Sequence, residues 1–508
     1  MSQLTQEMAL RDIVNKFSGD ANVAGLRVED QMVRRFFSSL LTKRFLICTG
    51  LAGSGKTKLA QAIAVWLSPR TRLGDPFKAG SLIESERTTY YVRSSDSLAV
   101  EFWNSADEQN AIKVVLPRKM IEEWAAYIEN NNIPRETGAR DIREAVKKGS
   151  KFSDQLHSFE THLKAAAFAL LAQRKEKTGT TCYEIVPVGA DWSGNENILG
   201  YADGLDQNRY VTRPALDLII SANKAPNVPH ILILDEMNLS HVERYFADVL
   251  SAIESEESIQ LYRGEARQAG ADIIPNLIDL PKNLFIIGTV NIDETTYMFS
   301  PKVLDRANVI EFRMTSEDLK AFLTSPCKPN MTDFSGKGSP FAKLFVETAS
   351  EPSQPFSNAL APVFEAEMLL FFDVLKGHGA EFGYRVAHEA ARFISFYGKL
   401  GDFDSTDEAD FDAAFDCVIV QKFLPKLHGS RAKLGPLLKK LWFLCVSDSH
   451  SRGSNPFQAA EASARSSDKN SDPSLAIPET APYKISAEKI ARMWRLLNEN
   501  GFASFAEA

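Results

Sequence analysis

The sequence predicts an α/β fold in which helices flank a parallel sheet, and three apolar runs lead to this prediction. They begin at residues 45, 231 and 284, and each ends in glycine or polar residues. Strands of a parallel sheet are covered by helices on both faces, so they form nearly continuous apolar runs. Ligands bind at the carboxyl ends of such strands, so the residues after each run are the first candidates for a site.

A glycine-rich turn follows the first apolar run, and a helix is predicted to open at Lys58. Such a turn directs backbone N–H groups and the positive end of the helix dipole at one point, where a polyphosphate binds. The predicted nucleotide-binding residues are Gly50, Gly53, Ser54, Gly55, Lys56 and Thr57. We expect Lys56 to contact the β- and γ-phosphates and the Thr57 hydroxyl to hold Mg²⁺. The alternative is an ordinary glycine-rich turn.

The second apolar run ends in two carboxylates, Asp235 and Glu236. In a parallel sheet both would lie beside the glycine-rich turn. We expect Asp235 to hold Mg²⁺, through water, and Glu236 to polarise the water that attacks the γ-phosphate. The alternative is that the pair only ends the strand and caps the next helix.

The third run ends at Asn291, which we expect to hold the attacking water or the γ-phosphate. A short helix and a further strand follow within residues 300–312, and Arg306 lies just before that strand. In a ring, this arginine would point into the neighbouring subunit's site as an arginine finger. Alternatively, it is a cation at a helix end or the partner of Asp305 in a salt bridge.

These segments resemble the AAA+ NTPases of the McrB type, the motor subunits of modification-dependent restriction systems, within the MoxR and midasin-like clade. The matching segments are 50–57 (Walker A), 234–238 (Walker B), 288–291 (sensor 1), 303–307 and 382–386. The resemblance implies an AAA+ P-loop core with an α-helical lid, in which Arg385 is the sensor 2 arginine. The McrB signature Met-Asn-x-x-Asp is replaced by Val-Asn-Ile-Asp-Glu at 290–294, where only the Asn matches.

The resemblance also implies a function. It implies a nucleoside triphosphatase that uses Mg²⁺ with GTP or ATP, is not itself a nuclease, and forms a homo-oligomeric ring, expected to be a hexamer. A separate McrC-like nuclease would be the partner, and DNA would be contacted through the complex. One alternative is a MoxR-like chaperone that remodels protein partners without DNA. A nucleotide-binding scaffold is disfavoured, because a pure binder does not need the base Glu236.

Length and composition agree with a large intracellular protein. A chain of 508 residues exceeds what one core supports, so several domains are expected. The net charge of −8 argues against general coating of DNA. The five cysteines are scattered and predict reduced core thiols. Neither a secretory leader nor an apolar run long enough for a membrane is present in the sequence, so we expect a cytoplasmic protein without membrane contact.

Five segments are predicted along the chain. They are a helical lead-in (1–40), the core (41–315) with a mainly helical insert at about 75–180, a helical lid and its extension (316–446), a flexible linker (447–484) and a C-terminal amphipathic helix (485–508). Apolar residues at helical spacing between 32 and 41 predict a helix that leads into the first strand. The C-terminal helix would dock on its own chain or on a partner.

Two of three further segments have two interpretations. The resemblance implies that the loop carrying Trp192 and Tyr201, and a hairpin formed by 258–263 and 278–280, project over the channel of a ring. Alternatively, the two aromatic residues are packed in an ordinary loop. The basic stretch 421–431 either faces DNA or donates to carbonyl groups at a helix end, and we favour the second interpretation.

Overall fold

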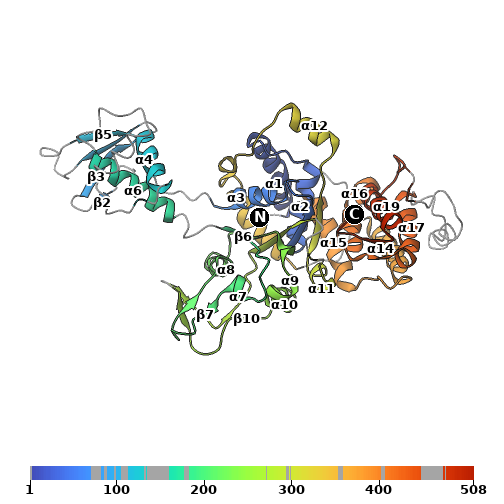
Figure 1. Cartoon of the computed structure of the whole chain (residues 1–508). Helices are drawn as coiled ribbons and strands as arrows, with labels where there is room; N and C mark the ends of the chain where they lie inside the picture. The colour runs from blue at the N-terminus through green and yellow to red at the C-terminus, as the bar shows by residue number, and fades with distance from the viewer. Residues whose placement is uncertain are drawn as a thin grey trace. The chain divides into compact units, whose positions relative to one another are not determined.

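The structure is a computed structural model, shown in Figure 1. It describes residues 3–69, 82–84, 89–95, 99–103, 113–130, 133, 160–176, 182–269, 272–292, 297, 299–352, 359–401, 407–447, 473–474 and 476–507. The chain forms two compact units, one made of Met1–Pro69 and Cys182–Ala508 and the other of Arg70–Thr181. Each unit is described separately.

The first unit contains a five-stranded sheet in which every neighbouring pair is parallel. The strands, in spatial order, are β15 (Asn308–Phe312), β1 (Phe45–Gly50), β14 (Leu284–Asn291), β9 (His230–Asp235) and β6 (Tyr183–Pro187). Every residue of β1 is buried. The predicted parallel sheet flanked by helices is therefore confirmed.

Helices cover both faces of this sheet, because successive side chains of a strand point to opposite sides. Leu46 and Cys48 of β1 belong to one buried apolar cluster, and Phe45 and Ile47 belong to another. The first cluster includes α1 (Gln3–Val23), α2 (Asp30–Thr42), α3 (Lys56–Leu67), η3 (Met331–Phe334), η4 (Ser339–Phe341) and α13 (Ala342–Ser350). The predicted amphipathic helix before β1 is confirmed as α2, whose apolar side is buried.

The second cluster lies under the shorter helices and hairpins between β6 and β15. These elements are α7 (Glu196–Leu199), β7 (Tyr201–Ala202), β8 (Tyr210–Val211), α8 (Pro214–Lys224), η2 (Met237–Leu239), α9 (Val242–Tyr245), α10 (Ala247–Ser255), β10 (Ile259–Gln260), β11 (Arg267–Ala269), β12 (Asp272–Ile274), β13 (Leu277–Ile278) and α11 (Pro301–Leu304). The expected hairpin is present, because Ile259 of β10 pairs with Ile278 of β13.

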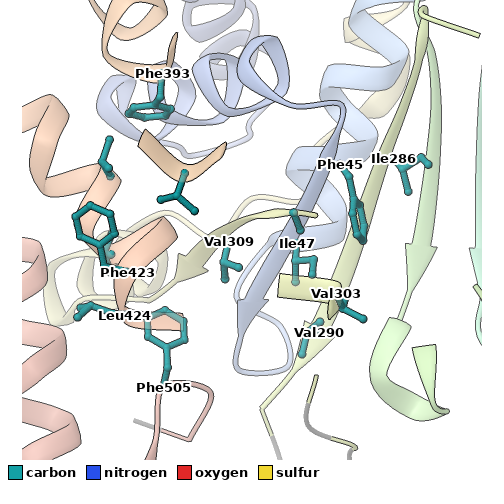
Figure 2. Packing of buried hydrophobic residues seen from close by; sticks show 14 of the residues in the cluster. Phe45, Ile47, Ile286, Val290, Val303, Val309, Phe393, Phe423, Leu424 and Phe505 are labelled. Atoms are coloured by element: carbon teal, nitrogen blue, oxygen red, sulfur yellow. The ribbon is translucent and has the colours of Figure 1, made fainter. Parts of the chain in front are cut away.

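The helical region after β15 shares this second cluster. After α12 (Ser316–Thr324), which buries no side chain, it contains α14 (Ala361–Lys376), α15 (Tyr384–Lys399), α16 (Glu408–Val418), η5 (Ile419–Phe423), η6 (Leu424–Lys426), β16 (His428–Ser430), α17 (Arg431–Val446), α19 (Lys484–Asn500) and β17 (Phe502–Ser504). Figure 2 shows Val309 of β15 in the same cluster as Phe423, Leu424 and Phe505. The sheet and the helical region are therefore continuous through one core.

The C-terminal helix docks on its own chain. Helix α19 packs against α16 and α17, and β17 pairs with β16. The buried carboxylate of Asp416 accepts hydrogen bonds from the backbone N–H groups of Ile485 and Ser486, each at 2.8 Å. Most of the predicted linker, residues 448–472 and 475, lies outside the described residues.

The second unit combines a sheet with two helices. Strands β2 (Leu82–Glu84), β3 (Thr89–Ser95), β4 (Ala99–Trp103) and β5 (Lys113–Pro117) form an antiparallel sheet, and α4 (Arg118–Asn130) and α6 (Glu160–Glu176) share a core with it. Helix in the insert was expected from about residue 117, and α4 begins at Arg118, whereas the four strands before it were not predicted. These strands are short, and only brief alternation, such as that of buried Val114 and Leu116 in β5, marks them in the sequence.

Four of the five cysteines are buried, as predicted for core thiols. Cys327 is the exception and is exposed. Its thiol donates to the backbone oxygen of Gly25 at 2.8 Å. The prediction was therefore wrong for Cys327, which follows the exposed helix α12 instead of lying in an apolar run.

Trp66 is the aromatic centre of the first cluster, and Gly338 fits closely against it. The indole is fully buried, stacks on Phe341 at 5.7 Å and donates to the Asp20 carboxylate at 2.9 Å. A Cβ atom on Gly338 would lie 2.1 Å from the indole Cε3. Neither the ring nor the backbone can move away without disturbing this packing.

We expect Gly338→Ala to lower the free energy of unfolding by about 1–3 kcal/mol, as overpacking of a core does. The measurement is chemical denaturation of the whole chain. Gly19→Ala is the matched control in α1, because a Cβ atom there meets nothing within 4 Å. Equal stability of Gly338→Ala and the unmodified chain would contradict the rigid packing of Trp66.

Candidate functional site

The loop between β1 and α3 has the backbone of an anion-binding turn. Gly53 and Gly55 have φ angles of +79° and +90°, which side chains with a Cβ atom rarely adopt. Helix α3 begins at Lys56, two residues earlier than Lys58, where the sequence predicted it. The N–H groups of Lys56 and Thr57 therefore belong to the first helical turn, where they have no intrahelical acceptor.

The Lys56 side chain lies along this loop. Its ammonium group donates to the backbone oxygens of Gly50 at 2.9 Å and Leu51 at 2.7 Å, and contacts the Ser54 hydroxyl at 3.3 Å. Burial lowers the pKa of Lys56, whereas the carboxylates of Asp235 and Glu236 raise it. An anion in the loop would take the place of these carbonyl partners.

Two hydroxyl groups meet at the carboxylate of Asp235. Its Oδ1 atom accepts hydrogen bonds from the hydroxyl groups of Thr57, at 2.8 Å, and Thr289, at 2.7 Å. The structure thus brings together the ends of β1, β9 and β14, as the sequence predicted for Thr57 and Asp235. The role of Thr289 was not predicted, although its position two residues before Asn291 was the available signal.

Glu236 has an unusual backbone and a defined side-chain partner. Its φ angle of +54° is in the left-handed region, which is uncommon for a residue other than glycine. Its N–H donates to the Thr289 hydroxyl at 3.1 Å, and its Oε1 accepts from the Asn291 amide at 2.8 Å. Backbone strain of this kind is concentrated at functional sites. The carboxylate is exposed and oriented, which a general base requires.

The donor set at Asp235 fits a hard cation. A threonine hydroxyl and a carboxylate, with their oxygens 2.8 Å apart, are ligands that Mg²⁺ accepts beside water and phosphate oxygens. Within the described ranges, no group of three or more His, Cys, Asp or Glu side chains is placed to hold a metal ion. A magnesium ion here would therefore rely on Thr57, Asp235, water and the phosphates.

A cavity of about 410 Å³ adjoins the glycine-rich loop. Its lining includes loop residues Gly50, Leu51, Ala52 and Ser54, residues 311–314 at the end of β15, and Arg492, Arg495, Leu496 and Glu507 of the C-terminal segment. Glu311 holds α19 here, since its carboxylate pairs with Lys489 at 3.0 Å and Arg492 at 2.7 Å. The sequence did not predict that the C-terminal helix lines this site.

Arg306 and Arg385 are not part of this assembly. Both guanidinium groups pair with the Glu254 carboxylate at the end of α10. Arg306 also donates to the backbone oxygens of Leu250 at 3.0 Å and Lys302 at 2.7 Å. Arg385, expected as the sensor 2 arginine, therefore does not contact the phosphate loop of its own chain. Arg306, predicted to point outward, is bonded within its own chain and is 19% exposed.

Both arginines lie at the opposite edge of the sheet from the glycine-rich loop. Arg306 precedes the amino end of β15, and Arg385 lines a cavity of about 450 Å³ together with Lys43 and Arg44, which precede β1. Strand β1 has six residues, so these edges are roughly 20 Å apart at about 3.3 Å per residue. An arginine side chain cannot span that distance.

The interpretation as an ordinary packed loop holds for one of the two aromatic residues of the loop that was expected to reach a channel. Trp192 is partly buried against the second cluster and meets Tyr245 edge to face at 5.4 Å. Tyr201 is 46% exposed. Trp192 is therefore a packed aromatic residue, whereas Tyr201 projects from its short hairpin. Asp293 and Glu294, which depart from the McrB signature, lie outside the described residues.

The comparisons with known proteins cover one part of the chain. Residues 342–502 match a domain family of unknown function, DUF8727. This match spans the helical region from α13 to the end of α19. No curated protein matches the chain. Among the described helices, none combines the length and apolar character needed to cross a membrane.

Proposed function

We propose that the chain is an AAA+ nucleoside triphosphatase similar to McrB, the motor or switch subunit of a restriction-type antiviral defence complex. The observation that carries this proposal is the convergence of the glycine-rich loop with the ends of β9 and β14 at one edge of the sheet. The hydrogen bonds of Asp235 to Thr57 and of Glu236 to Asn291 support it. The parallel five-stranded sheet is compatible with a P-loop core.

The side chains divide the chemistry of hydrolysis among them. Lys56 would exchange the carbonyl groups of Gly50 and Leu51 for phosphate oxygens. Glu236 would accept a proton from the attacking water, because Asn291 binds one carboxylate oxygen and leaves the other for water. When bound, Mg²⁺ neutralises charge on the phosphates, and Thr57 and Asp235 would hold it. GTP and ATP both satisfy this scheme.

The nucleoside would lie in the cavity between the loop and α19. Its volume of about 410 Å³ is within the usual range of ligand pockets, about 300–1,000 Å³. Arg495 is exposed at its wall, and Leu496 contributes apolar surface. The C-terminal helix would therefore form part of the nucleotide site.

Arg306 and Arg385 would act on the site of a neighbouring subunit. Their separation of roughly 20 Å from the loop of their own chain argues for this arrangement. In a ring, expected to be a hexamer, they would leave Glu254 and bind the neighbour's γ-phosphate, where a cation stabilises the transition state. The cutting of DNA would belong to a separate McrC-like nuclease. DNA would be contacted through the complex, in the cytoplasm; these assignments rest on the resemblance.

We expect Lys56→Ala to abolish nucleotide binding, because it removes the charge on the phosphates. Glu236→Gln should retain binding and lower turnover by about 10²- to 10⁴-fold, the usual contribution of a general base. Equilibrium binding of a fluorescent nucleotide and release of phosphate measure the two effects. Lys58→Ala is the control, because Lys58 is exposed on the same helix and contacts Gln61.

Normal turnover by Glu236→Gln would contradict the role of the base. The role in DNA cutting has a separate test, in which the protein is mixed with nucleotide, DNA and the product of the neighbouring nuclease gene. DNA cleavage that persists with Glu236→Gln would contradict a motor that drives the nuclease.

We expect Leu496→Glu to weaken nucleotide binding by about tenfold or more, because it places a charge against the nucleoside. Inorganic tripolyphosphate with Mg²⁺ occupies only the loop, so its affinity should not change. Asn498→Glu, at an exposed position of the same helix, is the matched control. An equal loss for tripolyphosphate and nucleotide, or no loss for either, would place the nucleoside elsewhere.

We expect Arg306→Ala to bind nucleotide normally and to lose turnover. Mixing Arg306→Ala with Glu236→Gln subunits should restore hydrolysis in part. In the mixture, an Arg306→Ala subunit keeps its base Glu236, and a neighbouring Glu236→Gln subunit supplies an intact Arg306 to that site. Phosphate release over a series of mixing ratios measures this recovery. A mixture that stays as inactive as its components would rule out an arginine supplied by the neighbour.

A further inference from the structure

Three charged side chains form a buried cluster at the amino edge of the sheet. Lys43, before β1, and Lys422, in η5, bind the two carboxylate oxygens of Glu389 on α15. Their side chains are only 12%, 7% and 10% exposed, respectively. The cluster therefore joins the sheet to two elements of the helical region.

The same two lysines hold the backbone on both sides of Arg306. The ammonium group of Lys43 donates to the backbone oxygen of Asp305 at 2.8 Å, and that of Lys422 donates to the backbone oxygen of Ala307 at 3.1 Å. In the basic stretch 421–431, Lys422 thus donates to a backbone carbonyl group, although Ala307 lies just before β15 and not at a helix end as the favoured interpretation expected.

The cluster also fixes the helix that carries Arg385. Glu389 is four residues after Arg385, so it lies one turn further along the same side of α15. At the other end, Glu254 binds both guanidinium groups. Glu389 therefore lies on the helix of Arg385 and binds the two lysines that hold the backbone beside Arg306, while Glu254 binds both guanidinium groups.

Stability alone does not explain this arrangement. Burial and the adjacent ammonium group of Lys422 together lower the pKa of Lys43 to about 7, against the effect of Glu389, which raises it. Burial also lowers the pKa of Lys422. Two ammonium groups share one carboxylate, so their desolvation is only partly offset. Apolar side chains of similar volume often stabilise such a position equally well or better.

We propose that Lys43, Glu389 and Lys422 are positioning residues that set the placement of Arg306 and Arg385 for the site of the neighbouring subunit. The inference rests on the proposed function. The cluster would act through the arginines of its own subunit, and it would leave that subunit's own nucleotide site intact.

The test replaces all three residues by methionine, which keeps the volume and removes the charges. The Lys43→Met, Glu389→Met, Lys422→Met chain should fold and bind nucleotide normally, with turnover reduced by about 10- to 100-fold, as for a misplaced catalytic group. Lys422→Met alone is the second variant, because it leaves the balanced pair of Lys43 and Glu389. Lys337→Met is the control, because Lys337 pairs with Asp20 in another part of the unit, at 3.3 Å.

Mixing with Glu236→Gln subunits separates positioning from general damage. Recovery of hydrolysis in these mixtures is expected for the triple variant and for Lys422→Met, because their own sites remain intact and the Glu236→Gln neighbour supplies the arginines. Damage to the variant's own site would prevent recovery. If Arg306→Ala recovers in such mixtures and the cluster variants do not, the positioning role is wrong. If Arg306→Ala fails as well, the neighbour's arginine and this inference are both overturned. Normal turnover by the cluster variants alone would also overturn the inference.

Discussion

The arrangement of the molecule depends on the burial of β1 between β14 and β15. Its carboxyl end opens directly into the glycine-rich loop, and its amino end is preceded by Lys43. The register of the parallel pairs places the carboxyl ends of the neighbouring strands beside that of β1, so Asp235, Glu236 and Asn291 lie at one edge of the sheet. The same pairing brings the amino end of β15, and with it Arg306, to the other edge. One strand therefore determines the positions of the candidate site at the carboxyl edge and of the charged side chains at the amino edge.

The two edges differ in how their charges are satisfied. At the carboxyl edge, Lys56 and Asp235 are held by backbone oxygens and hydroxyl groups, which are neutral partners. Exchanging a neutral partner leaves no opposite charge behind, whereas removing one partner of a buried ion pair leaves an uncompensated charge at a cost of about 3–5 kcal/mol. At the amino edge, the charged groups bind one another, as in the contacts of Glu389 and Glu254. A ligand can therefore displace partners at the first edge more readily than at the second.

Local patterns in the sequence were enough to predict most of the carboxyl edge. Apolar runs predicted the strands. Lys56, Asp235 and Glu236 follow these strands closely in the sequence, so the position of each strand end determines where they lie. The contacts of Arg306 and Arg385 could not be predicted in this way, since Glu254 lies 131 residues before Arg385 in the chain. The return of α19 to the loop depends likewise on ion pairs with Glu311, formed across 178 residues or more. The strands of the second unit have three to seven residues each, which gave too weak an alternation to predict them.

The helical region is attached to the sheet by buried charges at both ends of the β1 and β15 pair. At the carboxyl edge, Glu311 holds Lys489, whose side chain is fully buried, and Arg492. At the amino edge, Glu389 holds Lys43 and Lys422. A hinge motion of the helical region about either edge would break the charge pairs at the other, and a buried pair that loses one partner costs about 3–5 kcal/mol. A hinge motion of the helical region, as the proposed function would expect of a lid, is therefore costly. Motions of the loop, of Lys56 and of the two arginines as they exchange Glu254 for a phosphate break fewer buried contacts. On the proposed function, a nucleotide signal would therefore pass between subunits through these side chains, with the sheet and helical region moving as one body.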